Sequence, residues 1–344
     1  MKRYSSINDL AKDLKLSAST VSRALSDHYS ISDKTKKRVR EYAKKVGYQP
    51  NLNASNLIHR RTNIIGLIVP GITSYFFATI LKGILSVLDK ENYRLIIMET
   101  GDSLEKEIES VRFLTSVRAE GILFSPTSKT DTYEHFEPLV RNRIPFVNFD
   151  RGLKDLPCSS VLCDGELGAM KATQHLIDVG CKRIAHITGP ENLMNASNRL
   201  KGYKKALRKN GLKIDEKLII KGAFNLERGM GAVRQLFSFD PLPDGILAAN
   251  DGIALACLSE IRKRNLKAPE DIAVAGFDNE AYSAHFTPPL TSVDNRIFDM
   301  GKTAADLCVK QIQSDKPVEP ETVILEPELV VRESSRKGRV LHYV

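Results

Sequence analysis

Short β-rich runs alternate with helical segments over most of the chain, and this alternation limits the folds that it can adopt. Segments between the runs, such as 76–90 and 104–118, have the spacing of amphipathic helices. Strand–helix–strand repetition predicts parallel sheets with helices on both faces. The runs form two successive series: residues 64–69, 94–98, 121–124 and 145–149, and then residues 183–187, 218–220, 245–249 and 272–276. We therefore expect an α/β body made of two doubly wound parallel lobes.

The excess positive charge is confined to the first sixth of the chain. Of the 51 Lys and Arg residues, 14 lie in residues 1–62, whereas only 5 of the 42 Asp and Glu residues do. The rest of the chain carries 37 of each and has no net charge. A basic head on a neutral body is typical of a module that binds a polyanion, joined to a domain that binds an uncharged ligand or a protein. The alternative, a solubilising basic tail, does not explain the apolar periodicity of this segment.

Membrane and disulfide-rich classes are disfavoured by the sequence. No uninterrupted apolar run approaches the roughly 20 residues that cross a bilayer, and the first residues lack the apolar stretch of a secretory signal. We therefore expect a cytoplasmic protein with no membrane partner. The five scattered cysteines contain no Cys-x-x-Cys pair, which argues against a disulfide framework and a zinc site. We expect no metal and no cofactor.

The first 50 residues show the apolar periodicity of three helices, over 7–14, 18–25 and 33–46. A serine precedes each helix as a potential N-cap: Ser5 or Ser6, then Ser17, then Ser32. The first two helices are short and are separated by a tight turn. The pattern predicts an all-α helix-turn-helix unit.

In a helix-turn-helix unit the second helix enters the major groove, and its N-terminal residues contact base edges. Arg23 is the strongest candidate for reading bases, because a guanidinium can bridge guanine O6 and N7, which is worth roughly 1–3 kcal/mol of discrimination. The alternative is that Arg23 binds phosphate. Ser17 and Thr20 are expected to cap the helix or bind phosphate rather than read sequence. The predicted DNA contacts of this unit are Ser17, Ala18, Ser19, Thr20, Ser22 and Arg23.

Three segments of the head closely resemble the signature of the lactose-repressor (LacI/GalR) family. They are Ser6-Ile7-Asn8-Asp9-Leu10-Ala11, Leu16-Ser17-x-x-Thr20-Val21-Ser22-Arg23-Ala24-Leu25 and Val46-Gly47-Tyr48-x-Pro50-Asn51. The resemblance implies a sequence-specific transcription regulator. The chain departs from the family pattern at Lys15, where the family usually has a glycine. The turn must therefore accommodate a side chain in a tight conformation, for which a left-handed backbone is one solution.

Residues 51–62 resemble the hinge helix of that family, which folds on operator DNA and inserts paired leucines into the minor groove. By that match Leu57 is the wedge and Ala54 allows close approach, and Asn51 is a further predicted DNA contact. The alternative is a flexible linker whose Leu57 packs on the body. The polar composition favours a segment that orders against DNA.

Polar and aromatic residues follow several predicted strands, where doubly wound sheets bind their ligands. Carboxylate, amide and guanidinium groups can hydrogen-bond the hydroxyls of a sugar, and aromatic faces can stack on its ring. Taken singly, each residue is also explained as a cap or turn residue, as we expect for Asp251 before helix 252–264. Their convergence predicts an effector site formed by Tyr75, Phe76, Asp150, Arg199, Phe224, Asn250 and Asp278.

The body also resembles the effector domain of the LacI/GalR family. The matching motifs are Arg199-Leu200-x-Gly202-Tyr203, Ala249-Asn250-Asp251 and the segments 269–278 and 288–293. The resemblance implies a two-lobed periplasmic-binding-protein-like fold, with Arg199, Asn250 and Asp278 as effector contacts. We therefore expect a helix-turn-helix domain at 1–50, a hinge at 51–62 and an effector domain at 63–344, whose lobe one spans about 63–162 and 296–325 and whose lobe two spans about 163–295 and 326–335.

Together these features predict a transcription repressor that binds a pseudo-palindromic DNA operator as a homodimer and responds to a small molecule, a sugar or sugar derivative, held between the lobes. An enzyme is the rival of another class, in which Asp150 and Asp278 would form a carboxylate pair. The sequence has no Gly-x-Ser-x-Gly elbow, no Walker loop and no His-Glu-x-x-His, and we assign no catalytic residue. A secreted solute-binding protein would need a signal peptide and would have no use for residues 1–61.

Overall fold

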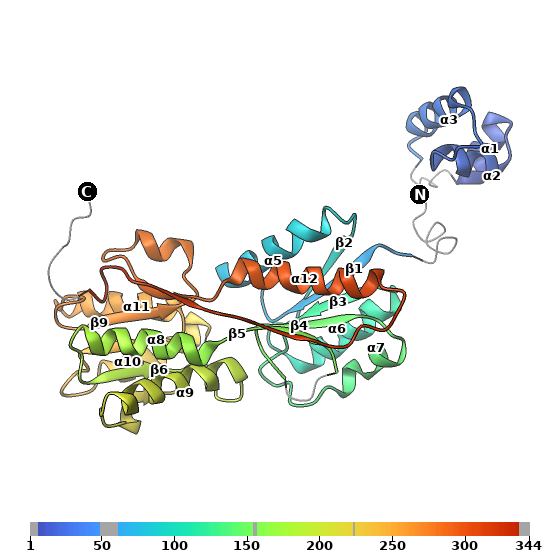
Figure 1. The fold of residues 1–344 in the computed structure, drawn as a ribbon. Coiled ribbons are helices and arrows are strands. Elements are labelled where there is room, and N and C mark those ends of the chain that lie inside the picture. Colours follow the sequence, from blue (N-terminus) through green and yellow to red (C-terminus); the bar gives the residue numbers. More distant parts are fainter. Residues whose placement is uncertain (1–5, 49–60, 154–156, 223, 337–344) are drawn as a thin grey trace. The chain divides into compact units, whose positions relative to one another are not determined.

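The computed structural model describes residues 6–48, 61–153, 157–222 and 224–336. It divides into two compact units, residues 1–62 and 63–344, which are described separately below (Figure 1). The predicted DNA contacts Asn51, Ala54 and Leu57 lie outside the described residues. The predicted fold class, an all-α head followed by a two-lobed α/β body, is confirmed.

The head consists of helices α1 (Ile7–Leu14), α2 (Ala18–Leu25) and α3 (Asp33–Lys45). Each begins at a serine whose hydroxyl accepts a hydrogen bond from a backbone N–H of the first turn, and at α1 Asp9 completes a capping box with Ser6. One apolar stripe from each helix meets in a small core that contains Leu10, Leu14, Val21, Ala24 and Val39. The caps therefore stabilise each helix at its N-terminus, and burial of the apolar stripes holds the three helices together.

The turn between α1 and α2 adopts the left-handed conformation at Lys15, with φ 54° and ψ 43°. The Lys15 N–H donates to the Lys12 carbonyl at 3.2 Å, and the Leu16 N–H donates to the Ala11 carbonyl at 2.9 Å. These bonds satisfy helix-end carbonyls in the manner of a C-terminal cap. A residue with a Cβ is disfavoured in this conformation, by roughly 1–2 kcal/mol for a left-handed residue.

We predict that Lys15→Gly stabilises the head by about 1 kcal/mol, because glycine adopts the left-handed conformation without a steric penalty. The free energy of unfolding of the head, from urea denaturation followed by circular dichroism, measures this. The matched control is Lys12→Gly in α1, where glycine should destabilise by about 0.5–1 kcal/mol. Destabilisation of the same size by both changes would contradict the assigned strain.

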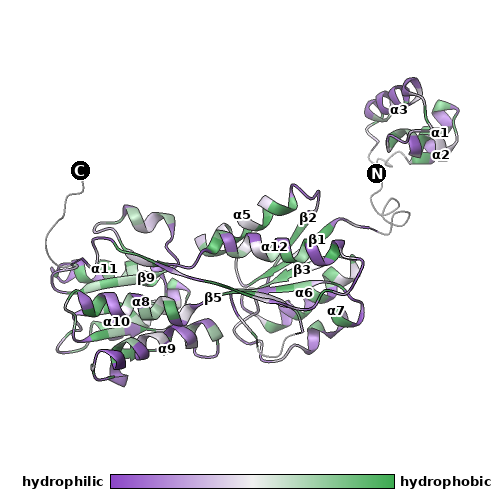
Figure 2. Cartoon of the chain, viewed as in Figure 1, coloured by the Kyte–Doolittle hydropathy of each residue, from purple (hydrophilic) through white to green (hydrophobic). Residues whose placement is uncertain are grey.

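Lobe one of the body is a six-stranded sheet with the order β11-β5-β4-β3-β1-β2. Its strands are β1 (Ile64–Val69), β2 (Arg94–Glu99), β3 (Gly121–Phe124), β4 (Phe146–Phe149), β5 (Ser159–Cys163) and β11 (Thr322–Leu325). One face is covered by α5 (Tyr75–Leu88) and α12 (Ile297–Gln313), which pack on each other. The other face is covered by α6 (Leu104–Ser116), the 3-10 turn η1 (Glu134–Phe136) and α7 (Glu137–Arg141). Figure 2 shows the hydrophobic character of the central strands that these helices enclose.

Lobe two repeats this arrangement, with the strand order β12-β10-β9-β8-β6-β7. Its strands are β6 (Ile184–Ile187), β7 (Ile219–Ile220), β8 (Gly245–Leu247), β9 (Ala273–Phe277), β10 (Thr291–Asp294) and β12 (Glu328–Val330). Helices α8 (Gly165–Asp178) and α9 (Met194–Lys209) contribute to one core cluster, and α10 (Leu226–Leu236) and α11 (Asp251–Lys263) to another. Two 3-10 turns complete the lobe, η2 (Glu216–Leu218) and η3 (Ala281–His285).

The two sheets differ from the sequence predictions in three respects. The run 218–220 forms only the two-residue strand β7, because Leu218 ends η2. Strands β5, β10, β11 and β12 were not predicted. Lobe two is not wholly parallel, since the edge strand β12 pairs with β10 antiparallel, whereas β11 pairs with β5 parallel.

Corresponding strands occupy corresponding places in the two sheets, so that β4 of lobe one is equivalent to β9 of lobe two. The chain passes between the sheets three times: from β5 to α8 at Asp164, from β10 to α12 at residues 295–296, and from β11 to β12 at residues 326–327. Because α12 and β11 return to lobe one, neither lobe is built from one continuous segment.

Candidate functional site

The head presents the residues predicted to contact DNA on and before α2. Ser17 is the N-cap, and its hydroxyl accepts the Thr20 N–H at 3.1 Å and lies 2.9 Å from the Ser19 hydroxyl. Ser19 and Arg23 are exposed, whereas Ala18, Thr20 and Ser22 are half-buried. Within the described residues the Arg23 guanidinium makes no hydrogen bond or ion pair and is available to a ligand. This is the arrangement that a base-reading helix requires.

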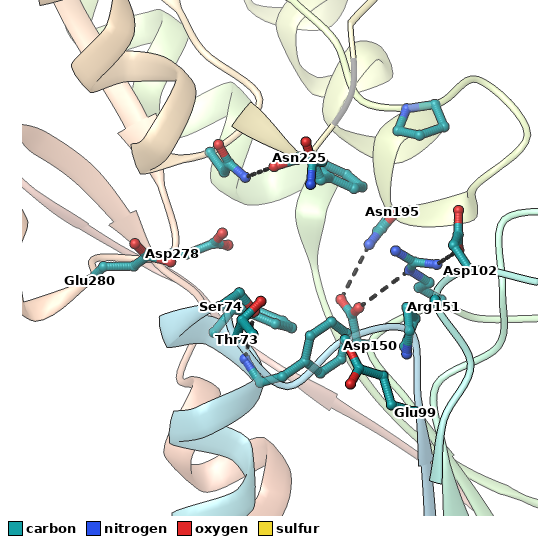
Figure 3. Close-up of a pocket in the computed structure, with 18 of the residues that line it drawn as sticks. Thr73, Ser74, Glu99, Asp102, Asp150, Arg151, Asn195, Asn225, Asp278 and Glu280 are labelled. Atoms are coloured by element: carbon teal, nitrogen blue, oxygen red, sulfur yellow. Dashed lines mark hydrogen bonds and ion pairs between the residues drawn. The ribbon is translucent and has the colours of Figure 1, made fainter. Parts of the chain in front are cut away.

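A cavity of about 430 Å³ lies between the two lobes of the body (Figure 3). Small-molecule sites typically measure about 300–1,000 Å³. The lining comes from both lobes and from loops that follow strands, as expected for doubly wound sheets. Lobe one contributes Pro70, Gly71, Thr73, Ser74, Phe76, Phe77, Glu99, Gly101, Asp102, Asp150 and Arg151, and lobe two contributes Pro190, Asn195, Arg199, Phe224, Asn225, Glu227, Asn250, Asp278 and Glu280.

Asp278 follows β9 in a left-handed conformation, with φ 96°. Its N–H donates to the Val293 carbonyl at 2.8 Å, and its carboxylate accepts from Asn295 Nδ2 at 2.6 Å. Burial raises the pKa of Asp278 to about 6, against the opposing effect of the Arg199 charge. A strained backbone at this position is typical of a functional residue.

Arg199 of α9 is a buried ion-pair partner of Asp278, with Nη2 3.5 Å from Asp278 Oδ1. Its Nη1 donates to the carbonyl of Ala249, which lies two residues after β8. The guanidinium lies over the Phe277 ring, 4.1 Å from the centroid, and 5.2 Å from the Phe224 centroid. Arg199 is therefore fixed by its neighbours before any ligand binds.

Asp150 follows β4 and is the lobe-one counterpart of Asp278, again with a positive φ, 64°. Its carboxylate accepts a hydrogen bond from Asn195 Nδ2 of lobe two at 3.2 Å, which joins the two lobes across the cavity. Burial raises the pKa of Asp150, and the nearby charges of Arg151 and Arg199 oppose this.

Arg151 and Asp102 form an ion pair beside Asp150, at 2.8 Å. The Asp102 carboxylate also accepts two hydrogen bonds from the backbone and hydroxyl of Ser128, at 2.8 and 2.5 Å. Burial alone would raise the pKa of Asp102, but these hydrogen bonds and the Arg151 charge outweigh it, and the pKa is lowered. Arg151 is thus already ion-paired with a carboxylate of its own lobe.

Six of the seven predicted effector residues line the cavity: Phe76, Asp150, Arg199, Phe224, Asn250 and Asp278. Tyr75 does not. Helical rotation turns it away from its neighbours Ser74 and Phe76, and its ring lies instead edge-on to the Tyr282 ring, with centroids 6.0 Å apart.

The roles of Asn250 and Asp251 differ from the prediction. Asn250, not Asp251, is the N-cap of α11, accepting the Ile253 N–H at 3.0 Å, and its Nδ2 donates to the Phe224 carbonyl at 2.8 Å. Asp251 is fully buried and accepts hydrogen bonds from the Glu280 N–H and from the hydroxyls of Ser283 and Ser292. Asp251 therefore anchors the loop after β9 rather than capping the helix.

The cavity also has polar lining residues that were not among the predicted effector contacts: Thr73, Ser74, Glu99, Asp102, Arg151, Asn195, Asn225, Glu227 and Glu280. Glu99 directly follows the predicted strand 94–98, so the rule that ligands lie beyond strand ends already pointed to it, although β2 extends to include it in the structure. Glu280 lies only two residues after Asp278. Asn195 and Glu227 lie on helices, so no strand end marks them in the sequence as residues of the cavity.

Comparisons with known proteins agree with this architecture. Residues 6–51 match the family described as "Bacterial regulatory proteins, lacI family", and residues 173–335 match "Periplasmic binding protein-like domain". The chain is 32% identical to the HTH-type transcriptional regulator DegA of Bacillus subtilis, over 96% of this chain and 97% of DegA. It is 31% identical to catabolite control protein A of Priestia megaterium, over 96% and 99% of the two chains.

Solved structures show the same likeness. A transcriptional regulator CelR–cellobiose complex superposes with a TM-score of 0.73 at 31% identity, covering 96% of this chain and 99% of that one. A lac repressor dimer bound to operator superposes with a TM-score of 0.84 at 24% identity, over 97% and 99% of the chains, and this likeness bears on the fold alone.

A helix-turn-helix head joined to a two-lobed domain with a central cavity defines the class of ligand-binding transcription regulators. The chain belongs to the lacI family of bacterial regulatory proteins and is a DNA-binding transcription regulator. Its relatives are named as regulators, not as enzymes. In the described part of the chain no helix is long and apolar enough to span a membrane, and no group of three or more His, Cys, Asp or Glu side chains is placed to hold a metal ion.

From the pKa values of two buried acidic residues, Asp251 and the cavity residue Glu280, we predict that the ligand-free body loses stability as the pH rises from 6.5 to 8.5. Burial raises the pKa of Asp251 to about 7 and that of Glu280 to about 8. The folded state then holds protons that the unfolded state has released, so stability declines with rising pH until these groups have ionised, at about pH 7 for Asp251 and about pH 8 for Glu280. Burial lowers the pKa of His186 to about 4, which acts in the opposite direction but only below pH 6.5.

Melting temperatures measured by calorimetry across this pH range test the effect. Glu280→Gln should flatten the decline above pH 7, because it removes the group with the pKa of about 8 without removing a hydrogen bond seen in the structure. Glu270→Gln, at an exposed glutamate of lobe two, should leave the decline unchanged. A melting temperature that is constant or rises with pH in the parent protein would contradict the assigned shifts.

Proposed function

We propose that the protein represses transcription by binding a pseudo-palindromic operator as a homodimer, and that a sugar or sugar derivative in the cavity changes its affinity for the operator. The proposal that an effector binds in the cavity rests on one observation. Asp150, Arg199 and Asp278 come from separate elements of both lobes and all line the same cavity. Relatives support the ligand class. CelR was solved with cellobiose, and a LacI-family regulator from Enterococcus faecium, 27% identical, was solved with ribose.

The proposed coupling is a change in the arrangement of the two lobes. The Asp150–Asn195 hydrogen bond crosses the cavity, and three chain segments link the lobes. A ligand that contacts both walls favours one arrangement over others by its difference in affinity for them. The segment 51–62 joins the body to the head, so a change in the body can alter how two heads engage two half-sites.

The proposed DNA-binding surface comprises Ser17, Ala18, Ser19, Thr20, Ser22 and Arg23 of the head, together with Asn51, Ala54 and the minor-groove wedge Leu57 of the hinge. The corresponding domain boundaries are 1–50, 51–62 and 63–344, with the lobe limits given above. Arg23 is exposed and has no hydrogen-bond or ion-pair partner in the part of the chain that the structure describes. This supports base reading, because a guanidinium engaged within the protein would be unavailable for the bidentate contact.

Arg23→Ala should weaken binding to a specific operator by about 1–3 kcal/mol, roughly 10- to 100-fold, and reduce discrimination at one base pair. The operator is first selected from a random DNA pool by the purified protein, and affinities for it and for random DNA are then measured by fluorescence anisotropy at fixed salt. Arg208→Ala, at an exposed arginine of the body, is the control. An equal loss on specific and random DNA would assign Arg23 to phosphate contact instead.

Asp278→Ala should abolish the effect of the effector on operator affinity and leave ligand-free operator binding intact, because Asp278 lines the cavity and lies far along the chain from the head. Thermal stabilisation by a panel of sugars, sugar acids, sugar phosphates, amino sugars and purines first identifies the effector class. Asp306→Ala, at an exposed aspartate of α12, is the matched control. An unchanged response in Asp278→Ala would remove this cavity from effector binding.

A further inference from the structure

The cavity is strongly acidic although the body as a whole carries no net charge. Its lining includes six carboxylates and two guanidinium groups, and no Lys or His among the described residues. The carboxylates are Glu99, Asp102, Asp150, Glu227, Asp278 and Glu280. Such an excess repels anions and attracts cations, and the effect is largest where water is excluded.

Both arginines are already paired inside the protein. Arg151 is held by Asp102 at 2.8 Å and by the Pro126 carbonyl at 3.1 Å. Arg199 is held by Asp278 and by the Ala249 carbonyl and lies over two phenylalanine rings. The Nε atoms of both arginines have no hydrogen-bond partner among the described residues, but an anionic ligand that took the terminal nitrogens would have to displace Asp102 or Asp278. Displacement of Asp278 would cost most, because its carboxylate is buried. The usual cationic partners for a phosphate or a sugar acid are therefore not free.

Glu280 is the carboxyl group most in need of a partner. The residue is only 6% exposed, it lines the cavity, and within the described residues its buried Oε2 has no hydrogen-bond partner and its carboxyl makes no ion pair. It lies beside Asp278 at the lobe-two wall of the cavity (Figure 3). The charged groups that face it are Asp278 and Asp251, both acidic. A buried polar group left unsatisfied is costly and needs an explanation, and a bound ligand group supplies one.

We propose that the effector of this cavity is a polyhydroxylated cation, such as an amino sugar, whose protonated amine binds beside Glu280 and Asp278, and that sugar phosphates and sugar acids are excluded. This inference rests on the proposed effector function and narrows its ligand class. The hydroxyls of the ligand would engage Asp150, Asn195 and Asn225, while the Phe76 and Phe224 rings cover its apolar face.

Proton release gives the proposal a specific signature. Burial and the acidic neighbours raise the pKa of Glu280 to about 8, so that it is largely protonated at pH 7. An amine that binds beside it stabilises the carboxylate and drives off its proton, up to about one per ligand. A neutral sugar hydrogen-bonded to the protonated group would release none.

The test is isothermal titration calorimetry of the full-length protein at pH 7 with matched sugars. Glucosamine, galactosamine and mannosamine are compared with glucose, galactose and mannose and with the three corresponding hexose 6-phosphates. Repeating each titration in two buffers of different ionisation enthalpy measures the protons released. We expect an amine to bind at least about tenfold more tightly than its neutral counterpart, with proton release, and the 6-phosphates not to bind.

Glu280→Gln should reduce amine affinity at least about tenfold and abolish proton release, while leaving the affinity for the neutral sugar unchanged. Glu270→Gln, at an exposed glutamate outside the cavity, should change neither. Because glutamine has the size of a protonated glutamate and removes only the capacity to ionise, a loss of amine binding in a variant with an undiminished melting temperature is not a folding defect.

Three outcomes would overturn the inference: tightest binding by a 6-phosphate, equal binding of an amine and its neutral counterpart, or no binding by any of the three amines. Affinity for the operator, measured by fluorescence anisotropy in the presence of each compound, distinguishes failure of this inference from failure of the proposed function. A neutral or phosphorylated sugar that alters operator affinity would reject the cationic effector and keep the regulator, whereas ligand binding with no effect on operator affinity would reject the proposed regulation.

Discussion

The carboxyl ends of two parallel sheets open onto one cavity, and most of the chemistry of the body follows from this constraint. Because β4 and β9 hold equivalent positions in their sheets, Asp150 and Asp278 reach the cavity from its two sides. Both have a positive φ, which non-glycine residues adopt at a cost. The surrounding hydrogen bonds impose the conformation, and they thereby place two buried carboxylates within the influence of Arg199.

Periodicity and strand-end position allowed much of this arrangement to be predicted. Runs of aliphatic residues identified eight strands, including the edge strands β2 and β7, whereas the interior strands β5 and β10 contain serine, threonine and aspartate and gave no such signal. The polar side chains of β10 are satisfied by tertiary partners, with Thr291 bonded to Arg332 and Ser335 and Ser292 to Asp251. Partners so distant in the chain leave no local pattern.

The same reasoning explains which site residues could be predicted. A strand end places Asp278 in the cavity, but the direction of a side chain within a helical turn depends on what the helix packs against, and Tyr75 points toward Tyr282 for that reason. Asn250 and Asp251 are adjacent acceptors with similar N-cap preference, and the choice between them is made by Ser283 and Ser292. In the head, where contacts are local, all three helices and their caps could be predicted.

Because each lobe is built from separate segments of the chain, the order of synthesis limits the order in which the body can fold. Lobe one packs α5 against α12, with Ile80 and Ile84 in the same core as Met300 and Ala304, and it pairs β5 with β11. These contacts join segments separated by more than a hundred residues, so the helix packing cannot form until α12 has been synthesised, and the strand pairing cannot form until β11 has been synthesised. All the residues that line the cavity are therefore made, up to Glu280, before the segments that complete lobe one behind them.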